Sequence, residues 1–167
     1  MSPAFRIASI AVLAAVTTVL TRLVQIPTPA RGYLNLGDVV IVFTAITLGP
    51  LSAMFAGGLG MALADLLSPF AVWAPISLVV HGAQGLLVGL IARVRPGTLW
   101  LNIVAGVVGI VIMAGGYLAG GSLVAGFGAS LADIPGNLIQ GAVGVLLGIL
   151  LAAAVSAAYP PVRNWKW

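Results

Sequence analysis

Long runs of mostly apolar residues, separated by proline, glycine and a few charged residues, dominate this sequence. Six such segments are marked off, at residues 7–23, 36–48, 51–67, 74–92, 99–118 and 134–158. A helix needs about 20 predominantly apolar residues, with about 17 as a lower bound, to cross the hydrocarbon core of a membrane. Every segment except the second reaches that length. The pattern therefore predicts membrane-spanning helices.

The scarcity of charge supports the same interpretation. Only 6% of the residues are charged and 61% are hydrophobic, whereas a soluble domain carries about 25% charged residues. This is too little charge to solvate a water-facing surface, so we expect the surface to face lipid. The length is that of one domain, and we assign residues 1–167 to a single integral membrane domain.

The second apolar segment is short, and its end carries a strong turn signal. Residues 36–67 together are too long for one span, and Pro50 lacks the amide hydrogen that a helix interior requires. We therefore predict two helices joined by a tight turn at Gly49 and Pro50. The predicted fold is an all-α integral membrane bundle of six transmembrane helices.

The distribution of basic residues predicts the orientation of this bundle. An even number of spans places both termini on one side, and a cytoplasmic N-terminus leaves only Arg22 and Arg31 outside. The basic residues on the cytoplasmic side are then Arg6, Arg93, Arg95, Arg163 and Lys166. This excess satisfies the positive-inside rule, and it also places Trp100, Trp165 and Trp167 at the cytoplasmic interface, where indoles are favoured. We therefore predict cytoplasmic N- and C-termini.

Two other interpretations of the same residues are weaker. The net charge of +4 suggests nucleic acid, but no basic cluster follows a phosphate backbone, so we expect no nucleic-acid partner. The first apolar segment resembles a signal peptide, but it lacks a convincing cleavage site with small residues. We interpret it as a retained helix.

Polar side chains gather near the outer ends of the predicted helices. Ionisable groups inside a membrane are costly and mark candidate functional sites. Asp133, Asn137 and Gln140 fall on one stripe of the last helix, because residues four and seven apart share a face. The predicted solute-binding residues are Tyr33, Asn35, Asp38, Asp65, Trp73, His81, Gln84, Asn137 and Gln140.

Each of these residues also has a structural interpretation. Asp38 and Asp133 fit first-turn acids that complement a helix dipole. Asp65 lies near a helix C-terminus, where that dipole is unfavourable, which indicates a functional role or an ion pair with Arg22 or Arg31. His81 and the amides of the last helix also fit interhelical hydrogen bonds.

Small residues form a second pattern. Ala4, Ala8, Ala11 and Ala15 lie along one face of the first helix. Glycines four apart occur at Gly85/Gly89, Gly116/Gly120 and Gly144/Gly148. Such spacing lets helix backbones approach closely in a membrane. The glycines indicate packing inside the bundle. The alanines fit either internal packing or a docking face for another membrane protein.

The sequence lacks the motifs that several classes of enzyme require. The only lysine is Lys166, so there is no P-loop, and neither a G-x-S-x-G nor an H-E-x-x-H motif is present. One histidine and no cysteine do not supply the usual ligand set of a transition-metal site. We therefore predict no enzyme activity, no metal and no cofactor, although an intramembrane protease built on His81 and Ser77 is conceivable.

Five short motifs together resemble one family of transporter subunits. They are GYLNLGD at 32–38, LGP at 48–50, GGLGMALADLL at 57–67, WAPIS at 73–77 and HGAQG at 81–85. This combination is similar to the substrate-binding S components of energy-coupling factor (ECF) transporters, in the branch labelled riboflavin-type. The motifs cover about half of the chain, and the six-span plan covers all of it.

The resemblance implies a membrane subunit that captures a small vitamin or vitamin precursor from the outer side. It further implies docking on a transmembrane coupling subunit through the alanine pattern of the first helix. Two ATPase subunits would supply the energy, in the plasma membrane of a prokaryote. The resemblance leaves the solute open. The acidic groups favour a neutral or cationic nitrogen heterocycle, whereas Arg22 and Arg31 on the outer side fit a solute with a carboxylate or phosphate equally well. The alternative is a channel or a structural helix-packing subunit without a captured solute.

Overall fold

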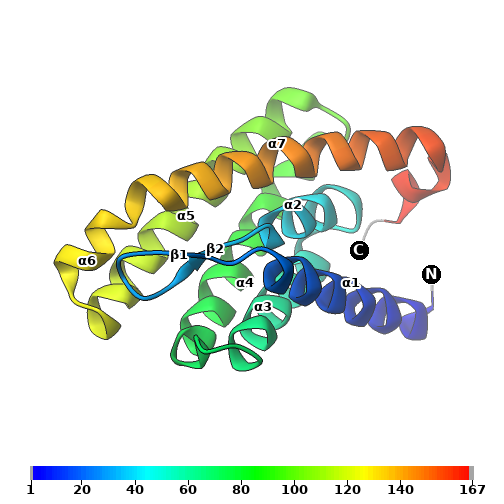
Figure 1. Cartoon of the computed structure of the whole chain (residues 1–167). Helices are drawn as coiled ribbons and strands as arrows, with labels where there is room; N and C mark the ends of the chain where they lie inside the picture. Colours follow the sequence, from blue (N-terminus) through cyan, green and yellow to red (C-terminus); the bar gives the residue numbers. More distant parts are fainter. Residues whose placement is uncertain (1, 166–167) are drawn as a thin grey trace.

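The computed structural model describes residues 2–165, and of Arg163 and Asn164 it describes the backbone alone. Each apolar segment identified in the sequence forms a helix (Figure 1). These helices are α1 (Pro3–Leu23), α2 (Gly37–Thr47), α3 (Pro50–Leu66), α4 (Ala74–Ala92), α5 (Leu99–Val124) and α7 (Ile134–Ala158). The shorter elements are β1 (Ile26–Pro27), β2 (Tyr33–Leu34), η1 (Ala71–Trp73), α6 (Phe127–Ala132) and η2 (Pro160–Asn164).

The helices differ in whether they are long enough to span a membrane. Within the described residues, four helices are long and apolar enough to cross one, namely α1, α4 together with η1, α5 and α7. The apolar helices α2 and α3 have 11 and 17 residues. At 1.5 Å per residue α2 is about 16 Å long, roughly half of the hydrocarbon thickness. The prediction of an all-α membrane architecture is confirmed.

The turn between α2 and α3 has the predicted form. The carbonyl oxygen of Thr44 accepts the amides of both Leu48 and Gly49, which ends α2. Gly49 has a φ of 102°, a conformation that residues with a Cβ rarely adopt. Pro50 then begins α3, where its missing amide hydrogen costs nothing.

Glycines bring the helices close together, as their spacing predicts. A Cβ added to Gly85 would lie 2.5 Å from the carbonyl oxygen of Ala53, so α3 and α4 pack nearly backbone to backbone. Gly148 similarly lies against Val42 and lets α7 approach α2. The short helix α2 is in contact with α1, α3, α4 and α7, and most of its residues are buried. It forms the centre of the bundle.

Residues 120–133, which lie between the fifth and sixth apolar segments of the sequence, are largely helical. Helix α5 continues to Val124, and α6 follows directly. The chain has no proline between Gly97 and Pro135, so no proline ends α5 before it reaches Gly120 and Gly121. Gly120 and Gly121 continue the helix because they fit against Ile76 and Trp73.

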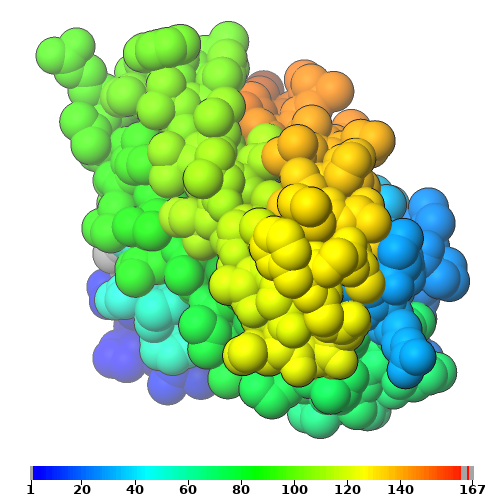
Figure 2. Space-filling view, turned by 90° about the vertical axis from the view of Figure 1, so that its left-hand side faces the viewer, coloured from blue at the N-terminus to red at the C-terminus, as the bar shows by residue number. Residues whose placement is uncertain are grey.

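The two ends of the described chain lie together at one end of the bundle (Figure 1). The rings of Phe5 and Trp165 are 5.3 Å apart and meet edge to face. The β hairpin and α6 lie toward the other end, which Figure 2 shows face on. Lys166 and Trp167, which we assign to the cytoplasmic interface, lie outside the described residues, as does the side chain of Arg163.

Candidate functional site

The connection between α1 and α2 folds back over the end of the bundle, and we call its residues 25–35 the lid. Its two short strands pair antiparallel, with Ile26 opposite Leu34 and Pro27 opposite Tyr33. Arg31 closes the turn between them with a φ of 59°, which is unusual for a residue other than glycine. In Figure 2 the lid, in blue, lies beside the yellow segment around α6.

Helix α7 holds the lid with two side chains. Asp133 accepts the Thr28 hydroxyl at 2.6 Å and the Ala30 amide at 3.1 Å. About two turns further along the same stripe, Gln140 accepts the Asn35 amide at 2.9 Å. Hydrogen bonds to a charged group are stronger than neutral ones. Asp133 is therefore the main fastening of the lid to α7.

The opposite side of the lid is held by α3 and η1. The Tyr33 hydroxyl donates to Oδ1 of Asp65 at 2.6 Å, and the Trp73 indole donates to the carbonyl oxygen of Arg31 at 3.0 Å. Asp65 therefore pairs with a tyrosine of the lid, and neither Arg22 nor Arg31 forms an ion pair with it among the described residues.

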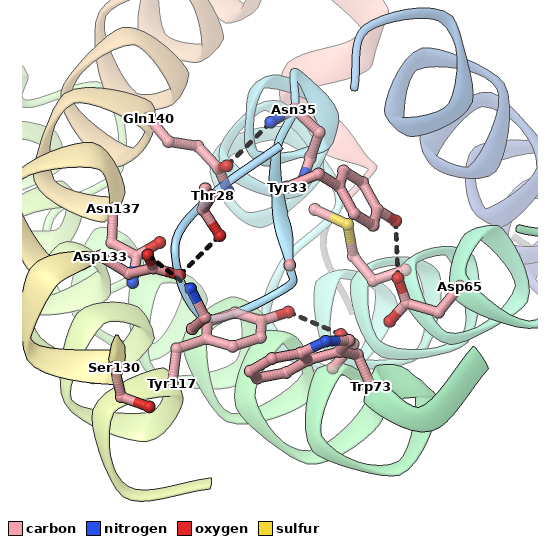
Figure 3. A pocket seen from close by; sticks show the side chains of 14 residues that line it. Thr28, Tyr33, Asn35, Asp65, Trp73, Tyr117, Ser130, Asp133, Asn137 and Gln140 are labelled. Carbon is pink, nitrogen blue, oxygen red and sulfur yellow. Dashed lines mark hydrogen bonds between the residues drawn. The ribbon is translucent and has the colours of Figure 1, made fainter. Parts of the chain in front are cut away.

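A small pocket lies beneath the lid (Figure 3). Its volume is about 30 Å³, close to the space of a single water molecule. The residues that line it come from the lid and from α3 to α7. They are Thr28, Ala30, Gly32, Tyr33, Asn35, Met61, Asp65, Trp73, Ser77, Tyr117, Ser130, Asp133, Asn137 and Gln140.

Aromatic rings form much of the pocket wall. The rings of Trp73 and Tyr117 are 5.9 Å apart and tilted by 51°, and Tyr33 is supported from behind by Phe70 at 4.7 Å. The hydroxyl groups of Ser77 and Tyr117 are 2.6 Å apart. Such a wall offers flat apolar faces with polar edges, an arrangement that suits a planar polar ring.

Oδ1 of Asp65 accepts from Tyr33, and the Ser77 hydroxyl interacts with the same carboxylate without forming a hydrogen bond of normal geometry. Its residue is 2% exposed, and its Oδ2 is buried with no hydrogen-bond partner. A buried acceptor without a donor is costly, so such an atom requires an explanation. The pKa of Tyr33 is raised well above its usual value by burial, by its hydrogen bond to Asp65 and by the negative charge there. Tyr33 is therefore held as a neutral donor.

A buried polar network lies below the pocket floor. Asp38 accepts Nε2 of Gln84 at 2.8 Å and Nε2 of Gln140 at 2.6 Å. Nδ1 of His81 is 2.6 Å from Oε1 of Gln84 and 3.5 Å from Oδ1 of Asp38. Because Gln140 also binds the Asn35 amide, the network connects the lid to the core of the bundle.

The structure divides the predicted binding residues into two layers. Tyr33, Asn35, Asp65, Trp73, Asn137 and Gln140 line the pocket. Asp38, His81 and Gln84 lie in the network below it, with the first-turn position of Asp38 in α2 as predicted. Sequence reasoning did not select Thr28, Ser77, Tyr117 and Ser130 as binding residues. Ser77 could have been selected from the sequence, because it lies one helical turn before His81.

The protease alternative depends on a contact between Ser77 and His81. Ser77, the conceivable protease nucleophile, bonds Tyr117, while Nδ1 of His81 is directed at Gln84. Serine hydrolysis needs a base within hydrogen-bond reach of the hydroxyl. That contact is not formed among the described residues.

The four alanines of the first helix lie on the outer surface of the bundle. Ala4, Ala8, Ala11 and Ala15 are all exposed, whereas Ala14 is buried at 7% exposure against α3. The inward face of α1 also contains the buried Thr17, Thr18 and Thr21. The alanine face therefore does not pack inside the bundle.

Fold and site together define an all-α membrane protein with a closed, polar, aromatic-walled pocket at one end. Residues 4–157 match the sequence profile of the ECF-type riboflavin transporter S component, and the chain belongs to this family. The resemblance drawn from the motifs is confirmed. The chain is a multi-pass membrane transport protein of the S-component class.

Two relatives support this membership. A protein of Pyrococcus woesei, described as “uncharacterized protein in gap 3'region”, is 38% identical over 133 residues, which cover 78% of this chain and 88% of that protein. The thiamine precursor transporter HmpT of Lactococcus lactis subsp. cremoris (strain MG1363) is 35% identical over 149 residues, which cover 88% of this chain and 82% of HmpT.

Proposed function

We propose that this chain is the substrate-binding subunit of an ATP-driven ECF importer and captures a small vitamin or vitamin precursor from the outer side. The observation that carries the proposal is the convergence of polar groups from the lid, α3, α4, α5 and α7 on one pocket, with Oδ2 of Asp65 buried and unpartnered. A solute that donates a hydrogen bond to this oxygen would satisfy it.

The solute is a planar nitrogen heterocycle, neutral or cationic, such as an aminopyrimidine or a pyridine alcohol. Trp73, Tyr33 and Tyr117 supply faces for stacking, and Asp65 accepts an amino or hydroxyl hydrogen on the edge of the ring. Asn137 supplies an amide that both donates and accepts. The name of HmpT, a thiamine precursor transporter, agrees with this class.

Capture requires the lid to open. Small-molecule sites generally have about 300–1,000 Å³, and the closed pocket has about 30 Å³. The lid is the mobile part, because side-chain hydrogen bonds hold it to its neighbours, whereas the helices around it are packed backbone to backbone. Opening breaks the bonds to Asp133 and Asp65, and the bound solute replaces part of them.

We place six membrane-crossing segments in the chain, with both termini in the cytoplasm of a prokaryote. The short helices α2 and α3 each cross as part of the bundle, since α2 is shielded by its neighbours. The close approach of Phe5 and Trp165 agrees with an even number of crossings. The positive-inside rule then assigns the pocket to the outer side.

Docking on the transmembrane coupling subunit would use the exposed alanine face of α1. Small side chains let a partner helix approach closely, and packing drives association in lipid. Ala11 and Ala15 lie near the middle of α1, where a crossing helix makes the largest contact. The coupling subunit and two ATPase subunits then couple ATP hydrolysis to release of the solute inside.

Reconstitution in liposomes tests the proposal. The chain is inserted alone, or with a coupling subunit and two ATPase subunits, and uptake of radiolabelled heterocycles is measured with and without internal ATP. We expect uptake only with all partners and ATP, and its loss in Asp65→Asn. Solute flux through the chain alone contradicts the proposal and favours the channel alternative.

A further inference from the structure

Asp38 lies at the centre of the buried polar network, below the pocket and outside its lining. It belongs to the first turn of α2 and is 1% exposed. Each of its two oxygens accepts an amide side chain from a different helix, Nε2 of Gln84 on α4 at 2.8 Å and Nε2 of Gln140 on α7 at 2.6 Å. Asp38 is thus the point at which hydrogen bonds join α2, α4 and α7.

The carboxylate of Asp38 determines which way each amide points. An ionised carboxylate only accepts hydrogen bonds, whereas a glutamine side chain donates through its nitrogen and accepts through its oxygen. Each glutamine must therefore turn its nitrogen toward Asp38, which leaves its oxygen for a donor elsewhere. The oxygen of Gln140 meets the amide of Asn35 in the lid at 2.9 Å (Figure 3). The oxygen of Gln84 meets Nδ1 of His81 at 2.6 Å.

The two ends of this chain of hydrogen bonds differ in how they can respond to a change. The backbone amide of Asn35 can only donate. An imidazole can carry its hydrogen on either nitrogen. Because the oxygen of Gln84 accepts, and Oδ1 of Asp38 is also only 3.5 Å away, Nδ1 of His81 carries a hydrogen. Nε2 of His81 is buried without a hydrogen-bond partner, so a hydrogen can move there without breaking an existing bond.

We propose that Asp38 is a positioning residue for the lid. It holds Gln140 as an acceptor, and the lid closes onto that acceptor through the Asn35 amide. The opposite orientation of Gln140 would place a nitrogen donor against the Asn35 donor, and the lid would lose this bond. His81 is the adjustable end of the network, because its ring can follow a change in the direction of the hydrogen bonds.

The same orientation bears on the solute, and this step rests on the proposed function. Gln140 lines the pocket, so its oxygen is left as an acceptor when the lid and its Asn35 amide move away. The side chains of α3 and α7 that hold the lid all do so as acceptors, namely Asp65, Asp133 and Gln140. The open site therefore selects a solute that presents N–H or O–H groups. Asp38 makes Gln140 contribute to this selection.

The single histidine of the chain makes the network directly observable. The protein, carrying a purification tag without histidine, is isotopically labelled at its histidine nitrogens, and their NMR chemical shifts report which of them carries hydrogen. We expect a hydrogen on Nδ1 of His81 in the unaltered, solute-free protein. A bare Nδ1 would mean that Gln84 points its nitrogen at the ring and its oxygen at Asp38, which overturns the proposal.

Asp38→Asn turns one of the two acceptor positions into a donor, so one of the two glutamines must turn around. A reversed Gln140 would lose the bond to Asn35. A reversed Gln84 would lose nothing, because His81 can move its hydrogen to Nε2 and accept through Nδ1. We therefore expect Nδ1 to lose its hydrogen in Asp38→Asn, while the Asn35 amide stays as protected from hydrogen exchange as in the unaltered protein.

Asp38→Asn combined with Gln140→Glu keeps the total charge and supplies the matched control. The nitrogen introduced at position 38 can donate to the carboxylate introduced at position 140, whose other oxygen still accepts the Asn35 amide. Gln84 then keeps its original direction, and we expect the hydrogen of His81 to return to Nδ1. A role of Asp38 in packing alone predicts the same ring state in all three proteins, since the replacements are nearly isosteric, and that result overturns the proposal.

A series of solute analogues tests the selection by Gln140 separately. Each analogue of a heterocycle that binds has one amino or hydroxyl donor replaced by a methoxy group. We expect one replacement to weaken binding about fivefold in the unaltered protein, the contribution of one hydrogen bond, and to have little effect in Gln140→Met. Equal losses in both proteins for every analogue overturn the selection by Gln140. If no heterocycle binds, the proposed function fails, while the ring state of the solute-free protein still decides the role of Asp38.

Discussion

The hydroxyl of Tyr33 donates to Oδ1 of Asp65 across 2.6 Å, and Oδ2 of the same carboxylate is buried without a partner. One carboxylate in the pocket lining thus fastens the lid with one oxygen and leaves the other buried without a hydrogen-bond partner. Under the proposed function, lid closure and solute recognition depend on the same residue. This arrangement predicts that solute affinity and lid stability change together at Asp65.

Removal of the charge on Asp65 should weaken solute binding. Asp65→Asn keeps the shape of the side chain but loses a charge-assisted hydrogen bond, which is worth about 1.5–3 kcal/mol. We expect affinity for the heterocycle to fall at least about tenfold, measured by titration calorimetry, with the protein still folded in a thermal melt. Unchanged affinity would assign Asp65 a purely structural role.

Tyr33 should make the stability of the protein depend on pH at the alkaline end. Its pKa is raised in the folded state, so the folded state holds the proton more tightly than the unfolded state. The stabilisation is therefore complete below about pH 10, the usual pKa of tyrosine, and declines as the pH rises above it. The melting temperature of the unaltered protein should exceed that of Tyr33→Phe at pH 8.

That difference should shrink as the pH rises above the usual tyrosine value. Other tyrosines titrate in both proteins, so their effects cancel in the comparison. A difference in melting temperature that is constant from neutral to strongly alkaline pH would contradict the assignment of Tyr33 as a neutral donor.

Asp133 should control how long the lid stays closed. Asp133→Ala removes the acceptor for Thr28 and Ala30, and each hydrogen bond to a charged group contributes about 1.5–3 kcal/mol. We expect faster hydrogen exchange at the Ala30 amide and at least about tenfold faster solute dissociation. Ser130→Ala is the control, because Ser130 lines the pocket but bonds only the carbonyl of Gly126. Equal lid exchange in the two variants would contradict the prediction.

Sequence patterns were sufficient for the six apolar helices, apart from the extension of α5 to Val124, and for part of the pocket. The turn at Gly49 and Pro50 follows from local backbone chemistry, and the stripe of Asp133, Asn137 and Gln140 follows from helix periodicity. Both features are local in the chain. The sequence did not predict how deeply each polar side chain is buried, because burial depends on how the lid packs against the helices.

Tyr117 illustrates what the sequence alone does not reveal. It lies in α5, which is apolar on all sides, so no periodicity distinguishes its face. Its partner Ser77 is on α4, 40 positions away, and the contact forms only when α4 and α5 pack together. The pairing of Asp65 with Tyr33, in place of an arginine, has the same cause, since it requires the folded lid.

The exposed alanine face of α1 should matter for assembly and not for solute capture. Ala11→Trp with Ala15→Trp places two large side chains where a partner helix would cross, so we expect loss of the complex and of transport. Solute binding to the isolated protein should stay nearly unchanged. Ala14→Trp is the contrasting variant, because Ala14 is buried, and it should destabilise the isolated protein. Loss of solute binding in the double variant would contradict a docking role.

The most direct test of the account is a titration of the purified protein, without partners, against a panel of heterocyclic vitamins and precursors. We predict that at least one aminopyrimidine or pyridine alcohol binds with a Kd below about 10 μM, equivalent to about 7 kcal/mol, and that Asp65→Asn binds it at least about tenfold more weakly. If no member of the panel binds more tightly than this limit, the chain is not the substrate-binding subunit proposed.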